Sequence, residues 1–160
     1  MRTETRWQSW FALAVSLVLV AAISAAGSLV TLPKISGWYA ALIKPAFNPP
    51  AWVFGPVWST LYVMMAVAAW RVWLESDPRG KRALWWYAAQ LALNAAWSQV
   101  FFGLEQPGWA LAVVLALLAT LVVTTWRFWS INRLAGWLMV PYLAWVAFAS
   151  LLNGAIVRLN

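Results

Sequence analysis

Long apolar runs, rather than short alternating or amphipathic stretches, dominate this sequence. A helix that crosses a bilayer needs about 20 mostly apolar residues, and in lipid the backbone polar groups must be satisfied inside each helix. Strands of a membrane barrel would instead alternate apolar and polar positions. The pattern predicts an all-α membrane protein in which residues 1–160 form a single domain, a bundle of five transmembrane helices at about 7–32, 51–74, 82–104, 108–129 and 134–159.

The longest connection, residues 33–50, has a different composition and is called the lid below. It reads PKISGWYAALIKPAFNPP, with four prolines, and Pro33 is expected to end the first helix. Trp38, Tyr39 and Phe47 give this Pro-rich loop apolar side chains of its own. Long loops of this kind usually cover or bind a ligand, so we expect a binding lid. The alternative is a cover that only seals the helix ends.

The first apolar run has a second interpretation as a secretory signal, because Arg2 and Arg6 precede it and small residues follow its core. A signal core spans only about 7–15 apolar residues, fewer than this run contains. We therefore favour a membrane helix.

Composition excludes a soluble domain. Hydrophobic residues make up 64% of the chain and charged residues 9%, whereas soluble domains average about 45–50% and about 25%. The chain has no Cys and no His, which removes thiolate chemistry, the usual metal ligand and the usual proton shuttle. We expect no catalytic residue, no metal site and no required cofactor.

The net charge of +7 concerns membrane topology rather than nucleic acid, because the basic residues are scattered between apolar blocks. The positive-inside tendency predicts a cytoplasmic N-terminus, with residues 33–50 and the C-terminus on the opposite side. A helical bundle favours a bacterial inner membrane, and the outer membrane stays open as an alternative. On the predicted cytoplasmic side lie Arg2, Arg6, Arg71, Arg79, Lys81, Arg82, Arg127 and Arg133, and on the other side lie Lys34, Lys44 and Arg158.

Most of the 15 tryptophans fit an aromatic belt at the membrane interface. Trp58, Trp97 and Trp145 lie deeper, inside three predicted helices. The belt set at the predicted cytoplasmic helix ends is Trp7, Trp10, Trp70, Trp73, Trp85, Trp86, Trp126, Trp129 and Trp137.

The run at 82–104 has two distinct helical faces. At about 100° per residue, a polar and aromatic face suits a pocket wall, and an opposite small-residue face lets a second helix approach closely. This predicts a pocket on one side and a homodimer interface on the other. The first face comprises Gln90, Asn94, Trp97, Ser98 and Phe101, and the second comprises Ala88, Ala92, Ala95 and Gln99.

Two further runs repeat the aromatic spacing of three and four residues. Aromatic faces that converge under an aromatic lid predict a pocket for a large, flat, apolar molecule. The alternative is that their polar groups only join helices by hydrogen bonds. These faces comprise Trp58, Tyr62 and Met65 in one run and Tyr142, Trp145, Ala149 and Asn153 in the other.

Three stretches carry a family resemblance: WYAALIKPAFNPPAWVFGPVWSTLY at 38–62, AAQLALNAAWSQVFFG at 88–103 and VPYLAWVAFASLLN at 140–153. The chain resembles the tryptophan-rich sensory protein and mitochondrial translocator protein (peripheral-type benzodiazepine receptor) family, TspO/MBR. The resemblance implies a dimeric five-helix membrane protein that binds porphyrins and related tetrapyrroles. For some members it implies sterols and isoquinoline or benzodiazepine drugs as well.

Position by position, the resemblance also implies which residues contact the ligand. Sterol-binding relatives carry a Tyr before a basic residue near the C-terminus, and the stretch LNGAIVR at 152–158 has none, which argues against sterol. The implied ligand-binding residues are Tyr39, Pro49, Trp58, Tyr62, Asn94, Trp97, Ser98, Phe101, Trp109, Trp145, Ala149 and Asn153.

Three functions are compatible with these residues. The first is a receptor or sensor for a metal-free porphyrin or another lipophilic small molecule. The propionates of a porphyrin would meet Lys34, Lys44 or the backbone donors near the start of the second helix. The second is light-dependent porphyrin degradation, in which Trp97 and Trp145 act as redox partners of the bound pigment. The third is facilitated transport of a lipophile, since a proton-coupled pump needs a carboxylate inside the membrane and no run has one in its middle.

Overall fold

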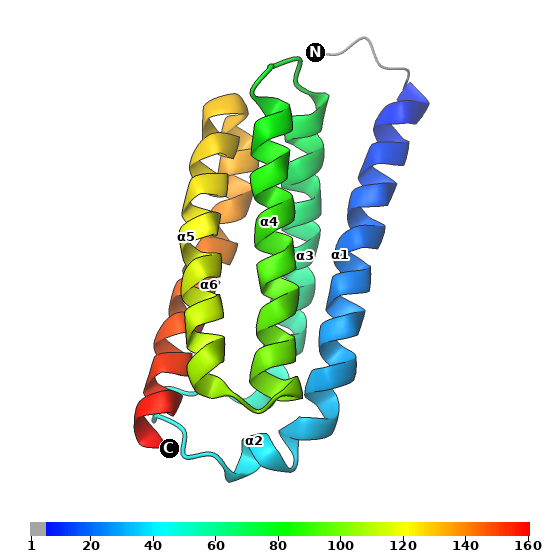
Figure 1. Ribbon diagram of the computed structural model, residues 1–160. Coiled ribbons are helices and arrows are strands. Elements are labelled where there is room, and N and C mark those ends of the chain that lie inside the picture. The colour runs from blue at the N-terminus through cyan, green and yellow to red at the C-terminus, as the bar shows by residue number, and fades with distance from the viewer. Residues whose placement is uncertain (1–5) are drawn as a thin grey trace.

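The computed structural model describes residues 6–160, and these form helices without any strand. Figure 1 shows the long helices side by side, with a short helix across one end of the bundle. The prediction of an all-α protein is confirmed for the described part of the chain. The elements are α1 (Arg6–Ile35), α2 (Trp38–Ala41), α3 (Ala51–Leu74), α4 (Gly80–Ser98), the π-helix η1 (Gln99–Gly103), α5 (Pro107–Ile131) and α6 (Arg133–Leu159).

Within residues 6–160, four helices are long and apolar enough to cross a membrane: α1, α3, α5 and α6. The helix α4 has 19 residues and carries Gln90 and Asn94 in its second half, which lowers its apolar character. The expectation that α4 and η1 together form a fifth span therefore stays a prediction.

The helix bounds agree closely with the sequence prediction at α3, α5 and α6. The prediction that Pro33 ends the first helix is wrong, because α1 continues to Ile35. Pro33 lies in the last turn, where its missing N–H removes a hydrogen bond from the end of the helix only. Part of the lid thus belongs to α1, and the lid also contains the short helix α2.

The run predicted as one helix at 82–104 changes its winding near its end. The α-helix stops at Ser98, and the following turn is a π-helix in which the Leu104 N–H donates to the Gln99 carbonyl at 2.9 Å. The wider turn directs two consecutive residues, Phe101 and Phe102, into the protein. Sequence periodicity of 3.6 does not anticipate this arrangement.

The helices α3, α4, α5 and α6 pack against one another, and α1 lies at the edge of the bundle (Figure 1). It contacts mainly α3, and Val20 is its only fully buried residue among residues 7–35. One side of α1 therefore borders the space between this helix and the rest of the bundle.

The turn between α5 and α6 holds these two helices unusually close. Asn132 caps α6, since its side-chain oxygen accepts the Ala135 N–H at 3.0 Å. A Cβ atom on Gly136 would lie 2.7 Å from Cβ of Trp129, so only glycine fits there. This end of the bundle is filled by buried alanines, valines, leucines and methionines and by the stacked rings of Tyr87 and Phe128.

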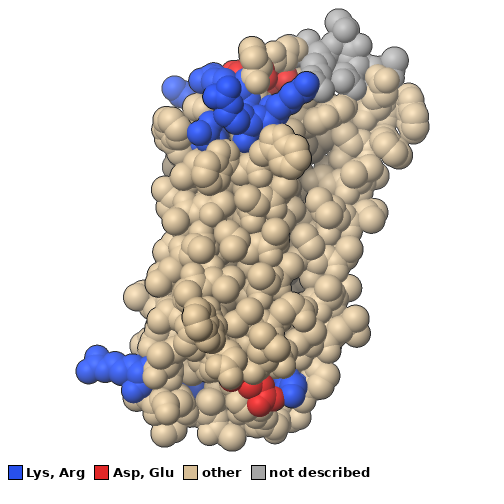
Figure 2. Space-filling view, in the orientation of Figure 1, with Lys and Arg blue, Asp and Glu red and all other residues tan. Residues whose placement is uncertain are grey.

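Basic side chains gather at the end of the bundle opposite α2 (Figure 2). This agrees with the segregation expected from the sequence for the described residues, while Arg2, Glu4 and the side chain of Arg6 lie outside them. The direction of the chain in the membrane stays a prediction.

Candidate functional site

A cavity of about 700 Å³ lies beneath the lid, between α1, α3, α4, η1 and α6. Trp58, Trp97 and Trp145 all line it, although they come from three different helices. The indoles that the sequence places deep in the bundle therefore face one shared space.

Aromatic contacts hold the α3 and α6 walls in place. The rings of Trp58 and Tyr62 lie 5.5 Å apart between centroids, and Trp58 meets Tyr142 edge-on at 6.1 Å. Phe54 packs edge-on against Trp145 at 5.9 Å. Each ring is thus supported by a second ring rather than by the cavity contents.

The π-helix η1 builds another wall. Trp97 stacks on Phe101 with centroids 5.3 Å apart, and Phe101 meets Phe102 at 4.8 Å. From the lid, Trp38 contacts Phe101 at 5.5 Å and Tyr39 contacts Phe102 at 5.6 Å. The turn that widens the helix is therefore also the one that joins the helix to the lid.

A buried hydrogen-bond network lies behind the α3 wall. The Tyr62 hydroxyl donates to Asn94 Oδ1 at 2.7 Å, and Asn94 Nδ2 donates to the Tyr142 hydroxyl at 2.8 Å. Asn94 itself does not line the cavity. Its observed role is to hold Tyr62 from behind.

Asn153 holds the indole of Trp97 in a similar way. Trp97 Nε1 donates to Asn153 Oδ1 at 3.0 Å, and Asn153 Nδ2 donates to the Pro107 carbonyl at 2.9 Å. Both polar groups of Asn153 are thus satisfied in the interior. This amide links the wall formed by α4 to the start of α5.

Much of the α1 wall consists of small residues that the sequence analysis missed, and Leu32 and Ile35 complete it. Ser24, Gly27, Ser28 and Thr31 line the cavity, and a Cβ on Gly27 would lie 3.4 Å from Ser98 Oγ. Their only sequence signal was a cluster of small residues late in the first run. That cluster also suits a signal peptide, so it did not indicate a cavity wall.

The lid is fastened to both the bundle and itself. Lys34 Nζ pairs with Glu105 Oε1 at 2.6 Å, and the Ile43 backbone exchanges two 3.0 Å hydrogen bonds with the Asn160 side chain. Lys44 Nζ donates to the carbonyls of Tyr39, Ala40 and Leu42 at 2.8, 3.1 and 2.8 Å. Both lysines expected to meet propionates are thus already engaged by protein oxygens.

The Tyr39 side chain forms a hydrogen bond within the lid, in which its neutral hydroxyl is the donor. Its hydroxyl donates to Asn48 Oδ1 at 2.9 Å. Burial raises the pKa of Tyr39 above that of a free tyrosine. The hydroxyl therefore stays protonated at neutral pH.

Most of the residues expected at the ligand line the cavity. Asn94 lies behind the wall, as described. Those at the cavity surface are Tyr39, Pro49, Trp58, Tyr62, Trp97, Ser98, Phe101, Trp145, Ala149 and Asn153.

Trp109 does not belong to the cavity wall, because its side chain is 73% exposed and it is not among the residues that line the cavity. The buried face of α5 comprises Ala110, Val114, Leu117 and Leu121. Trp109 is rotated about 100° from Ala110, which turns it outward. The expectation that it contacts a ligand in this cavity is corrected accordingly.

The small-residue face of α4 points outward. Ala88 and Ala92 are exposed, Ala95 is partly buried and Gln99 is exposed. The face is available for a second copy, and the homodimer stays a prediction.

Comparison with known proteins decides the family. A family model described as the TspO/MBR family matches residues 14–159. The chain belongs to the TspO/MBR family. The resemblance noted in the sequence is thereby confirmed.

Relatives in this family match over most of the chain. Human translocator protein is 44% identical over 126 residues, covering 77% of this chain and 75% of the relative. The tryptophan-rich sensory protein of Cereibacter sphaeroides is 43% identical over 147 residues, covering 92% of each. TspO of Chlorobaculum tepidum is 40% identical over 152 residues, covering 92% and 95%. With several apolar helices, this TspO/MBR protein is an integral, multi-pass membrane protein of a sensor and translocator family.

Proposed function

We propose that this TspO/MBR protein is a membrane receptor or sensor that binds a porphyrin or a related tetrapyrrole in the cavity beneath the lid. One observation carries the proposal: Trp58, Trp97 and Trp145 line a single cavity of about 700 Å³. Pockets for ligands of this kind typically span about 300–1,000 Å³ with mostly apolar and aromatic walls.

The walls suit a flat, apolar ring system. Stacking on indole and phenyl rings uses dispersion and the ring quadrupoles, neither of which needs a charged partner. The rings are held in position by neighbouring rings and by the amides of Asn94 and Asn153. A preformed site loses less side-chain freedom when the ligand binds.

The donor set favours a metal-free porphyrin over haem. No Met, Cys or His is among the described residues that line the cavity. The hydroxyls of Tyr39 and Tyr62 are already hydrogen-bonded to Asn48 and Asn94. Axial ligation of iron would have to break one of these bonds.

The remaining features of the proposal concern the assembly. We place the N-terminus in the cytoplasm and the lid on the opposite side of a bacterial inner membrane, with α4 and η1 as the fifth span. Two copies associate through Ala88, Ala92 and Ala95, which face outward or are partly buried on α4.

The test is a titration of detergent-purified protein with protoporphyrin IX, followed by the absorption of the bound pigment. The double variant Trp58→Phe, Trp145→Phe keeps apolar walls but removes two indoles. Because aromatic pairs contribute about 0.5–1.5 kcal/mol each, we expect Kd to rise about tenfold. The matched control replaces two exposed belt residues, Trp126→Phe and Trp137→Phe, and should leave Kd within about twofold. Equal effects of the two double variants would contradict the proposal.

Light-dependent degradation is the second candidate, because oxidisable indoles line the same cavity as the proposed pigment. Illumination of the bound pigment should then yield products that the Trp97→Phe, Trp145→Phe variant forms more slowly at equal occupancy. Product formation identical to that in detergent alone would leave binding as the function. Transport predicts porphyrin flux in proteoliposomes above that of empty liposomes.

A further inference from the structure

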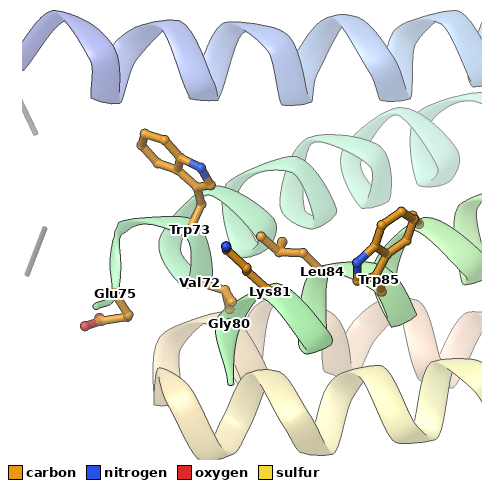
Figure 3. Close-up of a pocket in the computed structure, with 8 residues that line it drawn as sticks. Val72, Trp73, Glu75, Gly80, Lys81, Leu84 and Trp85 are labelled. Atoms are coloured by element: carbon orange, nitrogen blue, oxygen red, sulfur yellow. The ribbon is translucent and has the colours of Figure 1, made fainter. Parts of the chain in front are cut away.

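A second hollow lies at the opposite end of the bundle, between the last turn of α3 and the first turns of α4. It is a groove of about 410 Å³ lined mainly by apolar atoms. In the view of Figure 3, Lys81 and Leu84 lie between the indoles of Trp73 and Trp85, and Val72 lies next to Lys81. Among the residues that line this groove, the function proposed above uses only Ala88, in the contact between two copies.

The groove is positively charged at one end and apolar along the rest of its length. Lys81 stands at its outer end, in the first turn of α4, and Ala88 lies about 10 Å further along the helix axis. Leu84 and Trp85 lie between them. A ligand that follows this groove therefore needs an anionic group at one end and an apolar chain behind it.

The charge on Lys81 is not paired within the part of the chain that the structure describes. Lys81 and its neighbour Arg82 are exposed and have no ion pair with any residue that the structure describes. Of the nearby acids, Glu75 also borders the groove, and its Oε1 accepts Asn132 Nδ2 at 2.8 Å. Asp77 is paired with Arg79 at 2.6 Å, and this pairing holds the pKa of the Asp77 carboxyl below its usual value.

The surroundings of the groove also combine positive charge with an exposed aromatic ring. Figure 2 shows that basic side chains gather at this end of the molecule. Trp85 is 76% exposed, as expected for an indole at the boundary between headgroups and acyl chains. An anionic group at the depth of Lys81 would be a lipid phosphate.

We propose that the α3–α4 groove binds an anionic phospholipid, with its phosphate on Lys81 and one acyl chain along Leu84 and Trp85. A free phosphate ion would leave the apolar length of the groove unused. A phospholipid matches both parts of the groove, since it carries an anionic group for the basic end and an acyl chain for the apolar length.

The test is native mass spectrometry of the purified, delipidated chain, titrated with phosphatidylglycerol or with phosphatidylcholine of the same acyl chains. We expect phosphatidylglycerol to bind more tightly, and Lys81→Gln to weaken it about fivefold without changing phosphatidylcholine binding. The matched control is Arg133→Gln, which removes an exposed cation at the same end but outside the groove. It should stay within about twofold of the parent chain.

Three results would overturn the proposal. The first is an equal loss of phosphatidylglycerol binding in Lys81→Gln and Arg133→Gln, which would mean a diffuse charge effect. The second is competition by glycerol phosphate, which lacks acyl chains, at the same concentration as the lipid. The third is a change in the dimer fraction of Lys81→Gln with unchanged lipid affinity, which would assign the groove to a second copy.

Discussion

The half of the bundle beneath the lid and the half toward the α3–α4 connection contain similar apolar residues but are built differently. Beneath the lid, rings such as Trp58, Trp97 and Trp145 surround a cavity of about 700 Å³. In the other half, small and branched residues such as Ala66, Ala68 and Leu121 are almost wholly buried in a continuous core. Hydrophobicity alone does not separate the two halves.

The difference lies in how the side chains are held. Rings beneath the lid rest on each other and on the amides of Asn94 and Asn153, so they do not collapse inward. On the facing side, α1 presents Gly27 and two serines, which are too short to fill the space. A cavity thus needs both supported large residues on one side and small residues on the other.

The largest effect is expected in the solid half, at Gly136. In Gly136→Ala the new Cβ would lie within 3 Å of both Cα and Cβ of Trp129, so the α5–α6 pair must separate. We expect a loss of about 3 kcal/mol in the free energy of unfolding, measured by denaturation in detergent. Gly108→Ala is the control, because its Cβ would meet nothing within 4 Å. Equal stability of the two variants would show that this contact is not tight.

The next effect concerns the support behind the cavity wall. Asn94→Leu removes the partner of the Tyr62 and Tyr142 hydroxyls and leaves both buried without it, which should cost about 2 kcal/mol of unfolding free energy. Gln90→Leu, one turn earlier, is the matched control, since Gln90 Oε1 is buried with no partner among the described residues. That change should leave stability unchanged or raise it. If the two leucine variants unfold alike, the network does not support the wall.

A smaller effect is expected from filling the hollow half. Gly27→Leu places a side chain from α1 into the cavity opposite Ser98. We expect the Kd for protoporphyrin IX to rise about tenfold while the unfolding temperature is preserved. Gly108→Leu, whose Cβ points into open space, should bind as the parent chain does. Unchanged affinity in Gly27→Leu would place the ligand elsewhere.

The smallest effect is expected at Trp109. This residue lies near the lid end of the bundle but points away from the cavity. Trp109→Phe should therefore change the Kd for protoporphyrin IX by less than about twofold in the same titration. A tenfold loss would restore Trp109 as a ligand contact and require a ligand that extends beyond the cavity.

Much of the site is predictable because its spacing is local. Trp58 and Tyr62, or Trp145 and Ala149, share a helix face by periodicity alone, and the structure turns these faces toward one space. The small residues of α1 carry no comparable signal, because a glycine or serine in an apolar helix looks the same whether it faces lipid, a neighbour or a cavity. Trp109 is the opposite case, a large aromatic residue that the sequence suggested for the site but that lies outside it. An aromatic residue near a helix start does not show which face of that helix the neighbouring helices will cover.

By itself, the sequence determined that the chain is helical and apolar. It also determined where α3, α5 and α6 begin and end, and which indoles share a helix face with polar residues. These properties depend on residues only a few positions apart. Tertiary structure alone decided that α1 stands at the edge, that the turn at Gln99–Gly103 widens to bury Phe101 and Phe102, and that Lys34 is paired with Glu105. These outcomes depend on contacts between residues far apart in the chain. Such contacts set the free volume between helices, which no local pattern records.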